Sequence, residues 1–177
     1  SAPAALLRDA TVRAAEAIYR AAQEDAEHTG MGTPLTSVYF SQDYAIVCHV
    51  GDSRVYLYRD GHARQVTEDH SWIQEQVRAG LLSPDDALAS RFRNIITRSV
   101  GFEPSVEPDV ITLPVEAGDC FLLCSDGLSN YVSTEEIARV LTANFYRDAA
   151  RVLVEMANER GGDDNITCLI VYVSNAL

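Results

Sequence analysis

Apolar residues recur along the chain at two different spacings, which separate one long helix from a series of strands. Between Pro3 and His28 they form a stripe at three- and four-residue steps, which predicts an amphipathic helix that ends at Thr29-Gly30. Farther along, short apolar runs bounded by turn residues predict about seven strands, with a hairpin turn at Asp60-Gly61. The runs that predict these strands are LTSVYFSQ, YAIVCHV, RVYLYRDGHARQVT, VEPDVITLPV, CFLLCS and NITCLIVYV.

The segment at about 71–101 interrupts this series of strands. SWIQEQVRAG opens with a capping-box pair that starts at Ser71, and SPDDALAS places Ser83 before Pro84 at a first helical position. Both patterns predict short helices. Because the segment is too short to bury a core of its own, we expect a helical flap at about 71–101, inserted into a single domain that covers residues 1–177.

Two further helices are predicted near the C-terminal end. STEEIARVLTAN begins with Ser133 and Glu136 in a capping box, and RDAARVLVEMANERGG ends at Gly161-Gly162. Since most strands are joined by turns rather than by helices, the sheets should be mainly antiparallel. The pattern therefore predicts an α+β fold of four layers, a sandwich of two mainly antiparallel β-sheets flanked by α-helices.

Composition excludes some classes of partner. The formal net charge of −12 disfavours nucleic acid and anionic membranes, and no apolar stretch approaches a membrane span. The 177 residues, 47% of them hydrophobic, suit a globular domain. The four cysteines lie in apolar runs without metal-binding spacing, so we expect small buried side chains in a reducing cytoplasm: Cys48, Cys120, Cys124 and Cys168.

Three of the apolar runs border on acids. YAIVCHV leads into Asp52, CFLLCS leads into Asp126, and Asp163 and Asp164 precede NITCLIVYV. Carboxylates at rigid strand ends can hold a hard cation such as Mg²⁺ or Mn²⁺. Two such ions about 3.5–4 Å apart would polarise a phosphoryl group and activate a bound water. Spacing alone, however, also allows ordinary Asp-Gly and Asp-Asn turns.

Five ordered motifs favour the metal site over simple turns. VGDSRVYLYRDG, TEDHS, NIITRSVG, DCFLLCSDGLSN and DDNIT occur in the order and approximate spacing of the metal-dependent PPM phosphatases, also called protein phosphatase type 2C. GMGTPL resembles the Gly-Thr-Thr segment of that family, with Pro34 where the family usually has threonine. The resemblance runs from about Gly30 to Val173 and is to the compact bacterial members.

The resemblance implies a metal-dependent enzyme that hydrolyses phosphoserine and phosphothreonine in proteins. In that family a metal-bound water attacks phosphorus in line, so no side-chain nucleophile is expected. The complete family site holds two or three Mn²⁺ or Mg²⁺ ions. The implied partners are phosphorylated proteins and the serine/threonine kinases that such enzymes oppose in bacterial signalling.

The resemblance also implies roles for individual residues. Asp126 and Asp164 match the metal-binding aspartates of the Ser-Asp-Gly and Asp-Asn motifs, and Asp52 matches an aspartate that helps to bind a third, weaker metal. Four neighbours are weaker candidates that we expect to support the site: Gly127, Asn165, Asp163 and His70.

Other polar residues are expected to be structural. His49 lies inside an apolar strand, Arg54 should pair with a nearby acid, and Trp72 should pack within the flap. Ser53 and Ser125 have no adjacent pair of histidine and acid in the sequence, so neither is expected to be a nucleophile.

One part of the family pattern has no match. Family members carry, on N-terminal strands, a phosphate-binding arginine and an Asp-Gly-His/Met-Gly motif whose aspartate bridges the two catalytic metals. No such motif lies upstream of Ala4, and the Asp-Gly-His that starts at Asp60 falls in the predicted hairpin turn. We therefore expect this chain, lacking the N-terminal strands, to bind metal weakly and to have little activity alone.

Two further expectations follow from this mismatch. Unpaired sheet edges invite pairing with another chain, which predicts dimerisation or strand exchange. An incomplete metal set also leaves open a different class of function, a catalytically inactive PPM-like module that binds a partner. The retained Asp52, Asp126 and Asp164 favour the enzyme, and an upstream Asp-Gly-His/Met-Gly motif in a longer parent would decide.

Overall fold

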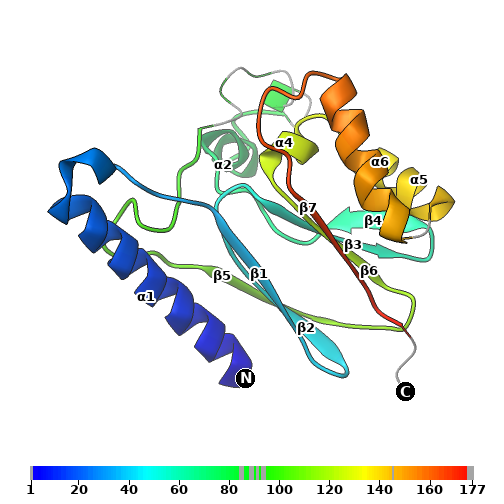
Figure 1. Cartoon of the computed structure of the whole chain (residues 1–177), viewed down its shortest axis with the longest axis horizontal. Helices are drawn as coiled ribbons and strands as arrows, with labels where there is room; N and C mark the ends of the chain where they lie inside the picture. Colours follow the sequence, from blue (N-terminus) through cyan, green and yellow to red (C-terminus); the bar gives the residue numbers. More distant parts are fainter. Residues whose placement is uncertain are drawn as a thin grey trace. The chain divides into compact units, whose positions relative to one another are not determined.

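The computed structural model describes residues 2–83, 86–87, 90, 92, 95–144 and 146–174 (Figure 1). The strands are β1 (Leu35–Phe40), β2 (Tyr44–Val50), β3 (Arg54–Arg59), β4 (His62–Gln65), β5 (Asp109–Pro114), β6 (Cys120–Cys124) and β7 (Cys168–Tyr172). The helices are α1 (Ala2–Glu24), the 3₁₀ turn η1 (Ala26–His28), α2 (Trp72–Arg78), α4 (Asp126–Ser129), α5 (Thr134–Ala143) and α6 (Tyr146–Glu159).

The chain forms two compact units and passes between them several times. Unit 1 comprises Ser1–Tyr39, Ile46–Asp52 and Glu68–Ile111, and unit 2 comprises Phe40–Ala45, Ser53–Thr67 and Thr112–Leu177. The segment predicted as a flap, 71–101, belongs to unit 1. That residues 1–177 act as one domain with an inserted flap stays a prediction.

Unit 2 is built on a four-stranded antiparallel sheet. Its strand order is β4-β3-β6-β7, and each neighbouring pair runs antiparallel. The predicted hairpin is confirmed, since β3 and β4 are joined at Asp60 and Gly61, which have φ of 50° and 81°. Positive φ at both central residues is what a tight two-residue hairpin turn requires.

Helices α5 and α6 lie together on one face of this sheet (Figure 1). The interface buries Leu122, Leu128, Ile137 and Leu153 completely. Each such side chain contributes about 1.5–3 kcal/mol relative to an exposed one, so this core is the main support of β6 and of the loop that follows it. The predicted capping box at the start of α5 is confirmed, with Ser133 as the N-cap.

Unit 1 contains most of the three-stranded sheet, whose order is β1-β2-β5, together with α1. Ala15 of α1 packs against Val50 at the end of β2, and Val100 and Val106 complete this small core. The small side chain of Ala15 lets the helix approach the sheet closely. The two sheets and their helices confirm the expected class of two antiparallel sheets flanked by helices.

One predicted boundary and one helix differ from the prediction. The first helix ends at Glu24 rather than His28, because the Asp25 side chain accepts a hydrogen bond from the Glu27 N–H and starts η1. The four-residue helix α4 was not predicted, since it is too short to show a periodic pattern.

The predicted helices of the flap are only partly observable. Helix α2 is confirmed with Ser71 as its N-cap. The second predicted flap helix lies largely outside the described residues, although the Asp86 N–H does donate to the Ser83 hydroxyl at 3.1 Å.

The cysteines lie in the strands as expected. All four are free; Cys48, Cys120 and Cys124 are buried and Cys168 is half-buried. Burial raises the pKa of the Cys120 and Cys168 thiols to about 11, which suppresses their reactive thiolate forms. These side chains therefore behave as small apolar groups.

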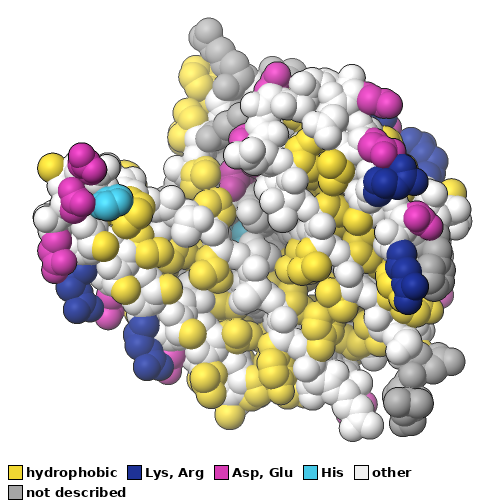
Figure 2. Space-filling view, viewed as in Figure 1, with side chains coloured by type: hydrophobic (Ala, Val, Ile, Leu, Met, Phe, Trp, Pro, Cys, Tyr) yellow, Lys and Arg dark blue, Asp and Glu magenta, His cyan; other side chains and the backbone are white. Residues whose placement is uncertain are grey.

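Acidic and basic side chains are intermingled on the exposed face of α1 and over α5 and α6 in the view of Figure 2. Among the described residues, no helix is both long and apolar enough to cross a membrane.

Candidate metal centre

The pairing of β6 with β7 brings two of the acid-bearing loops together in unit 2. Cys124, the last residue of β6, lies opposite Cys168, the first residue of β7. The residues that follow β6 therefore face the residues that precede β7. Asp126 belongs to the first of these segments, and Asp164 and Asn165 belong to the second.

Ser125 connects the two loops through three hydrogen bonds. Its hydroxyl donates to the carbonyl oxygen of Asn165 at 3.1 Å and accepts from the Thr167 N–H at 2.9 Å. Its own N–H donates to the Thr167 carbonyl oxygen at 3.1 Å. Because Ser125 directly precedes Asp126, these bonds fix the position of the Asp126 backbone relative to the loop that contains Asp164. Ser125 was expected to be structural, but the connection that it makes between these two loops was not predicted.

Gly127 allows the same two loops to touch. A Cβ atom at this position would lie 2.4 Å from the carbonyl oxygen of Asn165, a distance that no real contact reaches. Gly127 lies in α4 and is not among the glycines with positive φ. Its role is therefore to let the two backbones approach each other closely.

The neighbouring acids Asp163 and Asp164 make different contacts. The Asp163 carboxylate accepts a hydrogen bond from the Tyr131 hydroxyl at 2.7 Å. Asp164 Oδ1 accepts from the backbone N–H of Asn165 at 2.6 Å, which aligns its carboxylate with the loop that faces Ser125. That Asp164 is a metal ligand and Asp163 a supporting acid stays a prediction.

The donor chemistry of this loop pair fits a hard divalent cation. Mg²⁺ and Mn²⁺ take oxygen ligands, and Mg²⁺ is commonly held by one or two carboxylates with water completing its shell. Asp126 and Asp164 could hold such an ion. Within the part of the chain that the structure describes, no group of three or more His, Cys, Asp or Glu side chains could hold a metal. A dinuclear site would need ligands beyond these two.

Asp52, the third predicted ligand, belongs to unit 1. It follows β2 and is only 9% exposed. Gly51 before it has φ of 109°, and a Cβ atom there would lie 2.6 Å from the Pro34 side chain. Pro34 therefore packs closely against this turn, and only glycine fits at position 51.

His70, a weaker candidate, contacts the turn that carries Asp52. Its Nδ1 accepts a hydrogen bond from the Gly51 N–H at 3.0 Å, and its Nε2 lies 3.2 Å from Asp109 Oδ2. Arg98 Nη1 donates to Asp109 Oδ1 at 2.9 Å. Neither Asp109 nor Arg98 was predicted at this place, because tertiary packing brings them to His70 from 39 and 28 residues along the chain.

Burial lowers the pKa of His70, and the hydrogen bond to Asp109 offsets this only in part. Burial alone would raise the pKa of Asp109, but the hydrogen bond from His70 and the charge of Arg98 lower it. The cluster is therefore a neutral imidazole beside an ionised carboxylate and a guanidinium.

The remaining polar residues agree with their expected structural roles where contacts are described. His49 is fully buried in β2, Trp72 packs edge-on against Phe92 at 6.0 Å between ring centroids, and Arg54 donates to the Tyr56 hydroxyl at 3.0 Å. The expected pairing of Arg54 with an acid stays a prediction.

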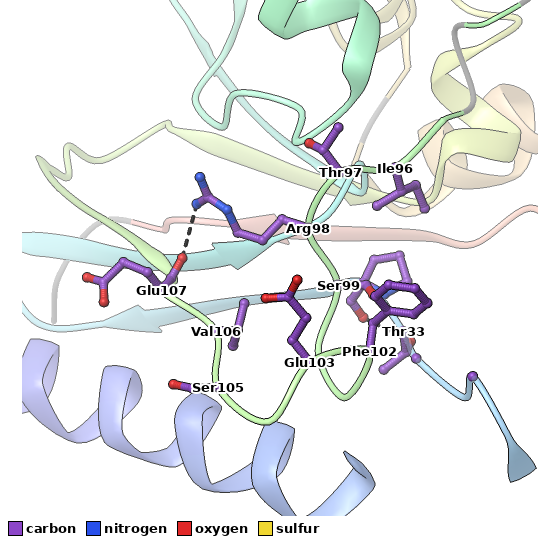
Figure 3. Close-up of a pocket in the computed structure, with 13 residues that line it drawn as sticks. Thr33, Ile96, Thr97, Arg98, Ser99, Phe102, Glu103, Ser105, Val106 and Glu107 are labelled. Carbon is purple, nitrogen blue, oxygen red and sulfur yellow. Dashed lines mark hydrogen bonds between the residues drawn. The ribbon is translucent and has the colours of Figure 1, made fainter. Parts of the chain in front are cut away.

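A pocket of about 470 Å³ opens within unit 1 between the segments 30–34 and 96–107 (Figure 3). Arg98 lines it and points toward the Glu107 carbonyl oxygen, to which it donates at 3.0 Å. None of the predicted metal ligands is among the residues that line this pocket.

Known proteins resemble this chain over most of its length. It is 40% identical over 151 residues to the serine/threonine phosphatase stp of Listeria innocua serovar 6a, covering 85% of this chain and 60% of that protein. It is 41% identical over 152 residues to protein phosphatase PhpP of Streptococcus pneumoniae, covering 85% of this chain and 62% of that protein. The chain thus spans about three fifths of the length of these curated relatives.

Solved structures share the fold. The serine/threonine phosphatase Stp1 from Staphylococcus aureus superposes with a TM-score of 0.92 at 32% identity, covering 96% of this chain and 67% of that chain. The catalytic domain of the serine threonine protein phosphatase PstP, solved in complex with 2 manganese ions, superposes with a TM-score of 0.82 at 36% identity, covering 91% of this chain and 67% of that chain.

The sequence pattern of protein phosphatase 2C matches residues 2–166, nearly the whole of the chain. With the ordered motifs, the two antiparallel sheets and the joined loops of Asp126 and Asp164, this match confirms the resemblance seen in the sequence. The chain belongs to the protein phosphatase 2C family.

Proposed function

We propose that this chain is part of an enzyme that carries out metal-dependent hydrolysis of phosphoserine and phosphothreonine in proteins. The observation that carries the proposal is the junction at the ends of β6 and β7, where Ser125 and Gly127 hold the Asp126 loop against the Asp164 loop. The relatives named serine/threonine phosphatases support the substrate class.

Asp126 and Asp164 would hold Mn²⁺ or Mg²⁺ at this junction. When bound, such an ion supplies Lewis-acid chemistry, lowering the pKa of a water and neutralising charge on the phosphoryl group. The protein's own contribution is to keep the carboxylates in place: Ser125 ties the loops, and the Asn165 N–H orients Asp164. The neighbour solved with manganese makes Mn²⁺ the first ion to test.

No serine is needed as a nucleophile in this proposal. The Ser125 hydroxyl is already hydrogen-bonded to the Asn165 carbonyl oxygen and the Thr167 N–H. It makes no described contact with a histidine, which a nucleophilic serine would need for activation. Hydrolysis without a phosphoenzyme intermediate is consistent with this arrangement.

The proposed substrates are phosphorylated proteins, and the proposed functional partners are the serine/threonine kinases that phosphorylate them. Four free cysteines suit a reducing compartment such as the bacterial cytoplasm, which we propose as the location. Dimerisation or strand exchange through sheet edges stays a prediction from the sequence.

The proposal is tested by hydrolysis of phosphothreonine, phosphoserine and phosphotyrosine peptides. The longest natural chain that contains this sequence should be assayed beside this chain, with Mn²⁺, with Mg²⁺ and with EDTA. We expect the longer chain to release phosphate from the first two peptides with Mn²⁺ and to lose this activity with EDTA, and we expect this chain alone to have little activity.

A matched pair of variants locates the activity. Asp126→Asn should abolish it, whereas Asp148→Asn, which removes an equal charge from the start of α6, should leave it unchanged. No activity in any chain with metal supplied would move the conclusion to the alternative, a PPM-like module that acts by binding.

A further inference from the structure

His70 binds both polar backbone groups of Gly51. The His70 N–H donates to the Gly51 carbonyl oxygen at 2.7 Å, and the Gly51 N–H donates to His70 Nδ1 at 3.0 Å. Gly51 is the residue with φ of 109° that directly precedes Asp52. The backbone and the side chain of a single residue, His70, therefore both hold the turn that carries Asp52.

The hydrogen bond from Gly51 determines the tautomer of the imidazole. Because Nδ1 accepts a backbone N–H, it carries no proton, and the proton of the neutral ring is on Nε2. That proton is donated to Asp109 Oδ2 at 3.2 Å. Arg98 Nη1 also lies 3.2 Å from Nε2, but two N–H groups face each other there, so this contact is not a hydrogen bond.

Asp109 holds the ring at Nε2, the nitrogen that does not face Gly51, and Arg98 holds Asp109. Arg98 Nη1 donates to Asp109 Oδ1 at 2.9 Å and to the Glu107 carbonyl oxygen at 3.0 Å, which anchors the guanidinium at the wall of the pocket (Figure 3). The ring of His49 packs against His70 with centroids 4.8 Å apart. The ring therefore has little freedom to rotate.

This enclosure also excludes a direct part in proton transfer. His70 is 6% exposed, and both of its nitrogens are already engaged. A group that exchanges protons with a substrate needs access to it. His70 is therefore a positioning residue.

We propose that Arg98, Asp109 and His70 form a positioning relay that fixes the Gly51–Asp52 turn and so sets the Asp52 carboxylate for binding a divalent cation. The inference rests on the proposed function in one respect, the role of Asp52 as a metal ligand. Removing the relay should loosen the turn and weaken Mn²⁺ binding, while the junction of Asp126 and Asp164 in unit 2 remains intact.

His70→Ala and His70→Asn separate the relay from general stability. Asparagine places its amide oxygen near the position of Nδ1 and can still accept from the Gly51 N–H, whereas alanine cannot. Val100→Ala is the control, because Val100 is fully buried in the same unit but makes no contact with the relay's side chains among the contacts described.

The first readout is hydrogen exchange of the Gly51 amide in metal-free protein. We expect exchange to be about tenfold faster in His70→Ala, corresponding to a lost hydrogen bond, and largely restored in His70→Asn. Val100→Ala should not raise the exchange rate of the Gly51 amide relative to the rates of neighbouring amides. Equal acceleration in His70→Ala and Val100→Ala, or no rescue by asparagine, would overturn the relay.

The second readout is Mn²⁺ affinity, measured by electron paramagnetic resonance without substrate and as the Mn²⁺ concentration that gives half-maximal hydrolysis. We expect His70→Ala and Asp109→Ala to raise that concentration about tenfold, the size typical of residues that orient metal ligands. Asp52→Asn should cause a similar shift, and combining it with His70→Ala should add little more.

Unchanged Mn²⁺ binding in Asp52→Asn, or full additivity of the two substitutions, would overturn the inference. Failure of the wild-type protein to hydrolyse any phosphopeptide would instead count against the proposed function. Amide exchange and Mn²⁺ binding would still decide the relay in that case, so the two failures are distinguishable.

Discussion

His49 lies in β2 with no exposed surface, and both of its ring nitrogens are hydrogen-bonded, to the Thr36 hydroxyl at 2.9 Å and to the Glu68 carbonyl oxygen at 3.1 Å. Burial, together with the nearby His70, lowers its pKa to about 4. At neutral pH it is an uncharged part of the core, as expected from its place in an apolar strand.

The lowered pKa of His49 makes the stability of unit 1 depend on pH. In the unfolded chain a histidine binds a proton below about pH 6.5, whereas folded His49 does so only near pH 4, so acid favours unfolding across this window. Lowering the pH from 7 to 5 should cost about 2 kcal/mol of unfolding free energy. His70, whose pKa is also lowered, adds a loss of the same sign.

Urea denaturation at pH 7 and pH 5 measures this effect. His49→Gln keeps a donor for the Glu68 carbonyl oxygen but cannot be protonated, so its stability should fall much less between the two pH values. An equal fall in wild type and His49→Gln would contradict the assignment.

At the scale of elements, one buried ion pair ties β3 to the turn before β6. Arg59 donates from Nε and Nη2 to the two carboxylate oxygens of Asp119, at 2.7 and 2.8 Å. The Asp119 side chain is 1% exposed, and its Oδ2 also accepts from the Glu116 N–H at 2.8 Å. The guanidinium thus neutralises a charge that has no access to water.

Removing Arg59 would leave that charge buried and unpaired. Arg59→Ala should therefore lower the unfolding free energy by about 3 kcal/mol, with Arg59→Lys intermediate. Arg151→Ala is the control, since its pair with Glu155 is exposed and should contribute about 0.5 kcal/mol or less. Thermal unfolding of the three variants measures these losses of unfolding free energy. Equal losses in Arg59→Ala and Arg151→Ala would contradict the account.

The junction between the Asp126 and Asp164 loops gives a second prediction at this scale. Gly127→Ala forces a Cβ atom toward the Asn165 carbonyl oxygen, which should cost about 1–3 kcal/mol of unfolding free energy. Ser125→Ala removes two side-chain hydrogen bonds and should cost about 1–2 kcal/mol.

Both substitutions should also weaken Mn²⁺ binding, because they move Asp126 relative to Asp164. Ser129→Ala, in the same short helix, should change neither quantity. Calorimetric titration measures the Mn²⁺ affinity, and thermal unfolding measures the loss of unfolding free energy. Normal Mn²⁺ affinity in Gly127→Ala would show that the junction does not position the ligands.

Elements with a local cause could be predicted from the sequence, and contacts between distant segments could not. The Asp60-Gly61 hairpin and the Ser133 cap depend on neighbouring residues alone, and both are confirmed. The contacts of Asp109 and Arg98 with His70 depend on tertiary packing, which no local pattern reveals. The family resemblance supplied the metal-ligand assignments, whereas the tie made by Ser125 emerged only from the structure.

At the scale of the whole molecule, the predicted ligands divide between the two units. Asp52 belongs to unit 1, and Asp126 and Asp164 belong to unit 2. The chain matches the protein phosphatase 2C pattern over residues 2–166 and spans about three fifths of the curated relatives, 60% and 62% of their lengths. The central proposal is that a metal-dependent phosphatase site is built on the junction at the ends of β6 and β7.

The most direct test compares the two adjacent acids of that junction by Mn²⁺-dependent hydrolysis of a phosphothreonine peptide, in the longest natural chain that carries this sequence. Asp164→Asn should lower kcat/KM by about a hundredfold or more, because it removes a metal ligand. Asp163→Asn should stay within about threefold of wild type, since asparagine can still accept from the Tyr131 hydroxyl. Full activity in Asp164→Asn, or loss in Asp163→Asn alone, would contradict the account.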